Sequence, residues 1–504
     1  MLVEPPYESF REGYGARAAQ VVWTRLVADL ETPVSAFLKI AAGRPNAFLL
    51  ESVEGGATRG RYSIIGLAPD LIWRAKGSRA EINTRPQADP EGFESLADDP
   101  LLALRRLIDN SRIVLPDGLP PMAAGVFGYL GYDMVRLMER LGEPKPDALG
   151  LPDAILIRPT VVLIFDAVKD EITVVTPVRH EPRLGAEAAY ARAVDRLTEA
   201  LDALDRPLDK SASAAEIPTA GTVRSNTTPE EYEAMVERAK DYIAAGDIFQ
   251  VVLSQRFEAA FELPPFALYR ALRRVNPAPF LYYLDFGGFS VVGSSPEILV
   301  RVRDRKVTVR PIAGTRPRGA TPAEDARHAE ELLADPKERA EHLMLLDLGR
   351  NDVGRVAEIG SVTVTDQFFL EFYSQVMHIV SNVEGKLDRR FDALDALVAG
   401  FPAGTVSGAP KVRAMQIIDE LEKEKRGVYA GCVGYFSADG AMDTCIVLRT
   451  SVVKDGRMYV QAGAGIVADS APDYEQAECV SKAKALFRAA EEAVRFAASA
   501  SRGQ

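Results

Sequence analysis

The sequence predicts an α+β protein, a layered α/β sandwich whose mixed sheets are largely antiparallel. Strand-like and helix-like patterns are interspersed without the strict βα alternation of a doubly wound sheet. Near the C-terminus, Ala438-Asp439-Gly440 and Lys454-Asp455-Gly456 have the composition of hairpin turns. Each turn separates two apolar runs, which favours consecutive antiparallel strands.

The clearest boundary is a segment at 205–227 that is rich in Ser, Thr, Ala and Pro and lacks apolar periodicity. It predicts a linker between an N-terminal domain, 1–204, and a larger domain, 228–496, followed by a tail at 497–504. In the first domain, strands are expected at 48–52, 61–69, 159–167 and 171–178, and a helix at 185–204.

In the second domain, Thr228 is expected to cap a helix, with Pro229 in the first turn and Glu231 closing a capping box. Asp335 is expected to cap the second of two consecutive helices. The helices are predicted at 322–334, 336–348 and 472–496, and the strands at 248–257, 289–294, 298–303, 306–312, 431–437, 442–453 and 457–463.

Composition restricts the classes of function. The chain has 504 residues, a net charge of -12 and a pI near 5.2, so nucleic acid and anionic membranes are not expected as partners. The start lacks the apolar region of a signal peptide, and no run of about 18 apolar residues occurs, so a cytoplasmic location is expected. Cys432, Cys445 and Cys479 lack CxxC spacing and are expected in the core rather than in disulfides or zinc sites.

Two pairs of glutamates have helical spacing. Glu338 and Glu341 share one face of a predicted helix, and Glu475 and Glu478 share one face of the last helix. If these faces meet, the carboxylates repel one another unless a cation such as Mg²⁺ neutralises them. Two solvated helix faces are the alternative that spacing alone leaves open.

Three glycine-containing segments could bring backbone N–H groups close to an anionic ligand: 311–319, 401–411 and 461–467. All three are expected as loops at the ends of regular elements. His378 lies among apolar residues on a probable strand, where a histidine is either a core residue or a catalyst.

Six ordered motifs closely resemble the chorismate-binding enzyme family: PIAGTRPRG, EHLMLLDLGRND, FPAGTVSGAPKVRAM, AGCVGYF, DTCIVLRT and GAGIVADS. They cover essentially all of 225–490, whereas FLLES and GRYSIIG resemble the first domain of the family more loosely. Within the family, the chain is most similar to the large subunits of anthranilate synthase. The resemblance implies the chorismate-utilising enzyme fold and a Mg²⁺-dependent lyase that converts chorismate and ammonia to anthranilate and pyruvate, the first committed step of tryptophan biosynthesis.

The resemblance also implies residue roles. Glu341 and Glu478 are expected to bind Mg²⁺, with Glu338 and Glu475 acting indirectly or through water. Chorismate contacts are expected from Gly314, Thr315, Tyr429, Arg449, Gly463, Ala464, Gly465 and Lys482. Arg449 can form a fork with one carboxylate, and Lys482 can meet another as a point charge.

The implied reaction begins with attack of ammonia at C2 of chorismate and loss of the C4 hydroxyl, and elimination of pyruvate follows. Glu297 is the candidate general acid for the departing hydroxyl. His378 matches the family histidine that is linked to the elimination step, either as a base or through positioning. Thr315 is a third residue that we expect to be catalytic.

Two positions distinguish relatives in the family. Ala313 replaces the nucleophilic lysine of aminodeoxychorismate synthases, and Gln250 replaces the lysine base of isochorismate and salicylate synthases. Both favour free ammonia as the nucleophile. Aminodeoxychorismate synthase and isochorismate synthase remain the alternative activities, and a non-catalytic chorismate-binding regulatory subunit is the alternative of another class.

No cysteine lies in a context that suits a glutaminase nucleophile, so the resemblance implies a separate glutamine amidotransferase subunit as the source of ammonia. It also implies feedback inhibition by L-tryptophan. Ser52 and the segment Pro279, Phe280 and Leu281 match family contacts to tryptophan, and the alternative is that two ordinary strands pack there.

Overall fold

The computed structural model describes residues 1–54, 58–208, 221–373 and 376–498. Most of the predicted linker and most of the predicted tail lie outside the described residues. None of the helices in the described ranges is long and apolar enough to cross a membrane.

The α-helices are α1 (Tyr7–Gly15), α2 (Pro33–Ile40), α3 (Pro100–Asn110), α4 (Ala186–Asp205), α5 (Pro229–Ala244), α6 (Pro265–Val275), α7 (Pro322–Ala334), α8 (Pro336–Gly354), α9 (Ala393–Gly400), α10 (Lys411–Leu421) and α11 (Pro472–Ala498). Short 3₁₀ helices are η1 (Pro121–Ala123), η2 (Tyr132–Leu137) and η3 (Gly404–Val406). The predicted caps are confirmed, because Thr228 and Glu231 form a capping box on α5, and Asp335 accepts hydrogen bonds from two N–H groups of α8.

The strands before the predicted linker are β1 (Gln20–Val27), β2 (Ala47–Glu54), β3 (Thr58–Lys76), β4 (Arg79–Asn83), β5 (Glu94–Ser95), β6 (Gly125–Leu130), β7 (Ala154–Asp166) and β8 (Glu171–Val178). The strands after it are β9 (Arg224–Ser225), β10 (Gln250–Ala260), β11 (Phe280–Asp285), β12 (Ser290–Ser295), β13 (Ile298–Arg303), β14 (Lys306–Val309), β15 (Ile312–Pro317), β16 (Thr363–Phe372), β17 (Val376–Lys386), β18 (Gly408–Ala409), β19 (Cys432–Ser437), β20 (Met442–Ile446), β21 (Thr450–Lys454) and β22 (Arg457–Ile466).

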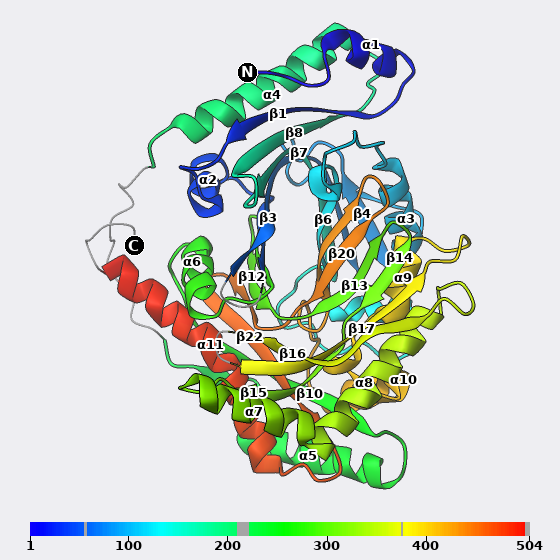
Figure 1. The fold of residues 1–504 in the computed structure, drawn as a ribbon, viewed down its shortest axis with the longest axis vertical. Helices are drawn as coiled ribbons and strands as arrows, with labels where there is room; N and C mark the ends of the chain where they lie inside the picture. The colour runs from blue at the N-terminus through cyan, green and yellow to red at the C-terminus, as the bar shows by residue number, and fades with distance from the viewer. Residues whose placement is uncertain (55–57, 209–220, 374–375, 499–504) are drawn as a thin grey trace.

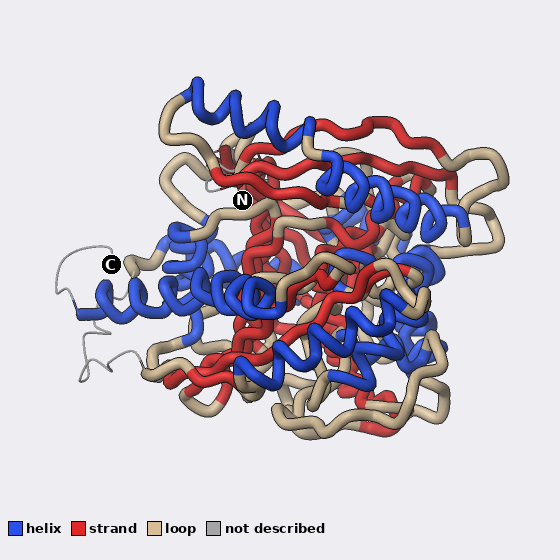
Figure 2. Tube along the Cα trace, turned by 90° about the horizontal axis from the view of Figure 1, so that it is seen from below, coloured by secondary structure: helices blue, strands red, loops and turns tan. Residues whose placement is uncertain are grey.

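Every ladder between these strands is antiparallel, which confirms the predicted α+β fold class. Helices lie on the outer sides of the strand layers in both views (Figures 1 and 2). In Figure 1, α4 lies above β1 and β8, whereas α5, α7 and α8 lie at the opposite end of the molecule, where α5 contacts α11. The strands therefore form a framework from which α8 and α11 present side chains to one region.

Strands from the two sides of the predicted linker are joined by hydrogen bonds. β2 pairs with β11 so that Ser52 lies opposite Phe280, and β6 pairs with β19 so that Leu130 lies opposite Cys432. Each of the three large hydrophobic clusters also contains residues from both sides. The first 204 residues thus pack directly against the region that carries the family motifs, and the division into two domains stays a prediction.

Some expectations about loops and strands were wrong. The single strand predicted over 442–453 is two strands, β20 and β21, because the chain breaks at Arg449, whose φ is +48°. The segments 311–319 and 461–467 are mainly strand rather than loop, since β15 and β22 run through them. Glycine content suggested loops there, but long-range pairing with β17 and β10 determines their conformation. The three cysteines are buried and unpaired, as predicted.

Candidate active site

Helices α8 and α11 place the four predicted glutamates beside β15 and β22. Burial raises the pKa of Glu341, and the negative charges of Glu338 and Glu478 raise it further. Burial likewise raises the pKa of Glu475, with a further contribution from Glu478. Carboxylates from two distant parts of the sequence are therefore close enough to repel one another, which helical spacing alone had left open.

The four carboxylates are neutralised unequally. Glu338 pairs with Arg316 at 2.8 Å and Glu478 pairs with Lys482 at 2.6 Å. Glu341 forms no ion pair with any cation in the described residues, and its Oε1 accepts a hydrogen bond of 2.9 Å from Gln250 Nε2. No group of three or more His, Cys, Asp or Glu side chains in the described ranges is arranged to hold a metal ion. A divalent cation here would need oxygens from water or a bound molecule as well.

His378 lies on β17 directly opposite Thr315 of β15. Its Nδ1 is 3.0 Å from both the Thr315 hydroxyl and the carbonyl oxygen of Gly314. Because a carbonyl oxygen only accepts, Nδ1 carries the proton and Nε2 keeps its lone pair. Burial lowers the pKa of His378 to about 4, and the charges of Arg449 and Lys482 act in the same direction. A neutral imidazole with a free Nε2 is suited to accept a proton.

Glu297 lies between β12 and β13 and is almost completely buried. Burial raises its pKa to about 8, although hydrogen bonds from Thr405 and from the backbone of Ile312 oppose the shift. The Thr405 hydroxyl is 3.1 and 3.2 Å from the two carboxyl oxygens. Glu297 therefore keeps a proton at neutral pH, which a general acid requires.

The predicted glycines lie where a side chain would not fit. A Cβ on Gly463 would lie 2.7 Å from the carbonyl oxygen of Leu253 and 2.9 Å from the Tyr429 hydroxyl, and a Cβ on Gly465 would lie 2.8 Å from Gln250 Nε2. Ala464 points the other way, into the hydrophobic core, so only its backbone is available to a ligand. The stretch thus places bare backbone beside Tyr429 and Gln250.

Two cations face this region. Lys482 Nζ donates to the carbonyl oxygen of Gly463 at 2.9 Å while it pairs with Glu478. Burial lowers the pKa of Arg449, which forms no ion pair within the described part of the chain. An unpaired, largely buried guanidinium favours binding of an anion.

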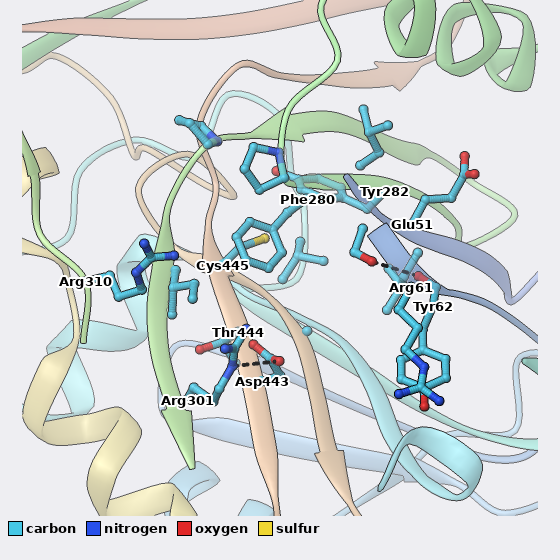
Figure 3. A pocket seen from close by; sticks show the side chains of 18 of the residues that line it. Glu51, Arg61, Tyr62, Phe280, Tyr282, Arg301, Arg310, Asp443, Thr444 and Cys445 are labelled. Atoms are coloured by element: carbon cyan, nitrogen blue, oxygen red, sulfur yellow. Dashed lines mark hydrogen bonds and ion pairs between the residues drawn. The ribbon is translucent and has the colours of Figure 1, made fainter. Parts of the chain in front are cut away.

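A cavity of about 890 Å³ lies between β2, β11 and β20 (Figure 3). All four residues predicted to contact tryptophan line it, namely Ser52, Pro279, Phe280 and Leu281. Phe280 and Tyr282 lie along one wall, and Arg301 pairs with Asp443 at 3.0 Å on another. Of the residues predicted to be catalytic, none lines this cavity, but Tyr373 lines it and its ring also contacts that of His378 at 5.4 Å.

The comparisons with known proteins are decisive for the family. The model of the chorismate binding enzyme family matches residues 46–488. The chain belongs to the chorismate binding enzyme family. Curated relatives include anthranilate synthase component 1 of Cereibacter sphaeroides, which is 60% identical over 99% of both chains, and that of Pseudomonas aeruginosa, 50% identical over 92% of this chain and 94% of the relative. These relatives confirm the predicted subfamily.

Solved structures agree with the fold of the family. Anthranilate synthase component I from Streptococcus pneumoniae superposes with a TM-score of 0.76 at 38% identity, covering 92% of this chain and 99% of that one. The isochorismate synthase MenF from Escherichia coli superposes with a TM-score of 0.70 at 18% identity, covering 96% and 98%. The second likeness concerns the fold alone.

Two residues of this candidate site were not predicted. Thr405 belongs to a segment that the sequence singled out for its glycines, yet nothing local indicated that its hydroxyl binds Glu297. Tyr373 follows β16 and gave no sequence signal, although it contacts His378 and its hydroxyl donates to Glu371 at 2.7 Å. Both contacts depend on tertiary packing.

Proposed function

We propose that the chain is the large subunit of anthranilate synthase, which converts chorismate and ammonia to anthranilate and pyruvate. The observation that carries the proposal is full-length similarity to anthranilate synthase component 1. The buried acid Glu297, the neutral base His378 and the cation Lys482 beside Glu478 support it. A cytoplasmic location is part of the proposal.

Chorismate would bind through its two carboxylates and the glycine-lined backbone. Arg449 is suited to one carboxylate because it has no ion pair in the described residues, and Lys482 can turn from Glu478 toward the other. Gly314, Thr315, Tyr429, Gly463, Ala464 and Gly465 are the proposed further contacts. The ligand would also exclude water, which strengthens these ionic contacts.

Mg²⁺ fits the donor set at this site. Glu341 is a half-buried carboxylate without an ion pair in the described ranges, and it lies within the electrostatic influence of Glu338 and Glu478. Glu341 and Glu478 would hold the ion, and Glu338 and Glu475 would act through water. When bound, Mg²⁺ supplies Lewis acidity toward the ring carboxylate of chorismate.

The two buried titratable groups divide the proton transfers. As ammonia forms a bond to C2, the two ring double bonds shift to C1=C6 and C4=C5 and the C4–O bond breaks. Glu297 gives its proton to the departing oxygen so that water leaves, and the new C2 ammonium loses a proton to become the amine. In the second step the C2 proton is removed, the bond between C3 and the enolpyruvyl oxygen breaks, and the ring becomes aromatic. The released enolate takes up a proton at its methylene carbon to give pyruvate. His378 Nε2 would take that proton, and the contact of Thr315 with Nδ1 supports this role.

Ammonia is proposed to come from a separate glutamine amidotransferase subunit. Glutamine hydrolysis by a cysteine requires a thiolate, and burial raises the pKa of Cys432 and of Cys479 to about 12 and that of Cys445 even further. None of the three thiols in the chain can therefore serve as that nucleophile.

L-Tryptophan is proposed to bind in the 890 Å³ cavity, where Ser52 and the Pro279–Leu281 segment lie together. The cavity has an apolar wall for an indole ring and charged groups that suit an amino acid. Dose-dependent loss of activity with tryptophan would support this assignment, and unchanged activity at millimolar tryptophan would refute it.

The test of the activity uses the purified chain with chorismate, ammonium and Mg²⁺ at mildly alkaline pH. The expected result is a fluorescent product that co-elutes with anthranilate, together with pyruvate. Isochorismate or aminodeoxychorismate as the product would replace the proposal by one of the alternative activities. Chorismate bound but not consumed would indicate a regulatory subunit.

A further inference from the structure

A buried ion pair that none of the proposed steps uses contacts η3 and β10. Glu422, just after α10, and Arg426 are joined by two hydrogen bonds of 2.6 and 2.9 Å, and their side chains are only 5% and 1% exposed. A buried ion pair costs desolvation energy and contributes little net stability. Its contacts therefore indicate another role.

Arg426 connects three parts of the site. Its guanidinium donates to the carbonyl oxygen of Val406 at 2.7 Å and to that of Val252 on β10 at 2.6 Å. It also lies 5.6 Å from the centre of the Tyr429 ring, within the range of a cation–π contact. One planar group thus fixes η3, β10 and a proposed chorismate contact at the same time.

Glu422 extends the network to the glycine-lined strand. One of its oxygens accepts hydrogen bonds from the backbone N–H of Ser254 at 2.8 Å and from the Ser254 hydroxyl at 2.9 Å. Ser254 lies opposite Gly463 in the β10–β22 ladder, and the Tyr429 hydroxyl would be 2.9 Å from a Cβ on Gly463. The position of Gly463 relative to Tyr429 therefore depends on this carboxylate.

The contact with Val406 is the one closest to the chemistry. Val406 follows Thr405, whose hydroxyl donates to Glu297. We propose that Arg426, held by Glu422, is a positioning residue that keeps Thr405 on Glu297 and Tyr429 beside Gly463, which rests on the proposed anthranilate synthase activity. A lysine at this position could not reach Glu422, Val252 and Val406 together, because an ammonium lacks the planar fork of a guanidinium.

The test measures kcat of the full chain for ammonia-dependent anthranilate formation in R426K, T405V and the double variant. R426K is expected to lower kcat on the order of 10²-fold while the chain stays folded by circular dichroism. If Arg426 acts partly through Thr405, the double variant loses less than the product of the two single losses. Wild-type kcat in R426K, or losses that multiply, would overturn the proposal.

Two further variants keep the outcome clear. R158K alters a two-bond pair between Arg158 on β7 and Asp70 on β3, at 2.7 and 3.1 Å, and should leave kcat unchanged. If R426K does not fold, S254A is used. It removes the hydroxyl hydrogen bond to Glu422 and the one that this hydroxyl accepts from Gln461, and it keeps the backbone bond to Glu422. A severalfold loss of kcat supports the proposal and unchanged kcat contradicts it. If the wild type forms anthranilate and neither R426K nor S254A changes kcat, the positioning role alone is refuted. If the wild type forms no anthranilate, the proposed activity is refuted as well.

Discussion

Among single residues, Glu297 is the acid whose protonation should govern the pH dependence of turnover. Its pKa is raised to about 8 by burial, so the protonated fraction falls as pH rises through that value. We expect kcat to decline above about pH 8 and E297Q to lower kcat by about 10² to 10⁴-fold. The measurement is a pH–rate profile with saturating chorismate.

The variant T405V tests whether the alkaline limb of the pH–rate profile belongs to Glu297. The Thr405 hydroxyl holds the pKa of Glu297 down, so its removal should move the alkaline limb to higher pH without abolishing it. Stability should respond as well, because the folded chain keeps this proton to about pH 8 while the unfolded chain releases it at a lower pH. The free energy of unfolding should thus decrease as pH rises across that window, and E297Q should remove this contribution. An unshifted limb in T405V would contradict the assignment.

Glu341 is the residue on which the metal proposal depends. It has no ion pair in the described residues, and its pKa is raised by burial and by neighbouring carboxylates. We expect chelation with EDTA to abolish activity, added Mg²⁺ to restore it, and E341Q to raise the Mg²⁺ concentration needed for half-maximal activity by about tenfold or more. E475Q, on the same cluster but assigned to water-mediated contact, should have a smaller effect. Equal effects of the two variants would contradict the assignment.

At the scale of secondary-structure elements, variants of two helix caps distinguish an effect on stability from an effect on Mg²⁺ binding. D335A should cost about 1 kcal/mol of stability, because Asp335 accepts hydrogen bonds from two N–H groups at the start of α8. T228A removes the equivalent cap of α5, which carries none of the four glutamates of the candidate site, at a similar cost. Only D335A is expected to raise the Mg²⁺ requirement, since α8 carries Glu338 and Glu341. Urea unfolding and Mg²⁺ titration of activity distinguish the two, and a raised requirement in both variants would count against the role of α8.

Strand β22 presents backbone rather than side chains to the site, and its glycines test that arrangement. G463A is expected to cost about 1–3 kcal/mol, because a Cβ would lie 2.7 Å from the carbonyl oxygen of Leu253. G288A is the control, since a Cβ there meets nothing within 4 Å. Thermal unfolding measures both, and a wild-type midpoint in G463A would show that β22 can shift without cost.

At the scale of the whole molecule, the sequence predicted the features that depend on residues close together in the chain. Capping residues, hairpin turns and the spacing of the glutamates all act within a few residues, and the structure contains the helices and most of the strands that they predicted. The pairings of β2 with β11 and of β6 with β19 have no local signal. The contact between Thr405 and Glu297 spans 108 residues and could be found only in the folded chain.

The same limit explains the wrong loop assignments. Glycines at 314, 463 and 465 suggested turns, whereas they permit close approach within strands whose pairing partners lie far away in the sequence. The roles proposed for Arg449 and Lys482 came from family resemblance. The structure adds the burial of the Arg449 guanidinium and the contact of Lys482 with the carbonyl oxygen of Gly463. The choice between ammonia and water as the nucleophile depends on the complete site and not on these two residues alone.

The most direct test follows the nitrogen atom. The purified chain is incubated with chorismate, Mg²⁺ and isotopically labelled ammonium, and the products are identified by mass spectrometry. We predict labelled anthranilate and an equal amount of pyruvate from the wild type, and neither product from a variant that combines E341Q with E478Q. An unlabelled hydroxylated product from water, or labelled anthranilate from the double variant, would contradict the proposed carboxylate-centred site.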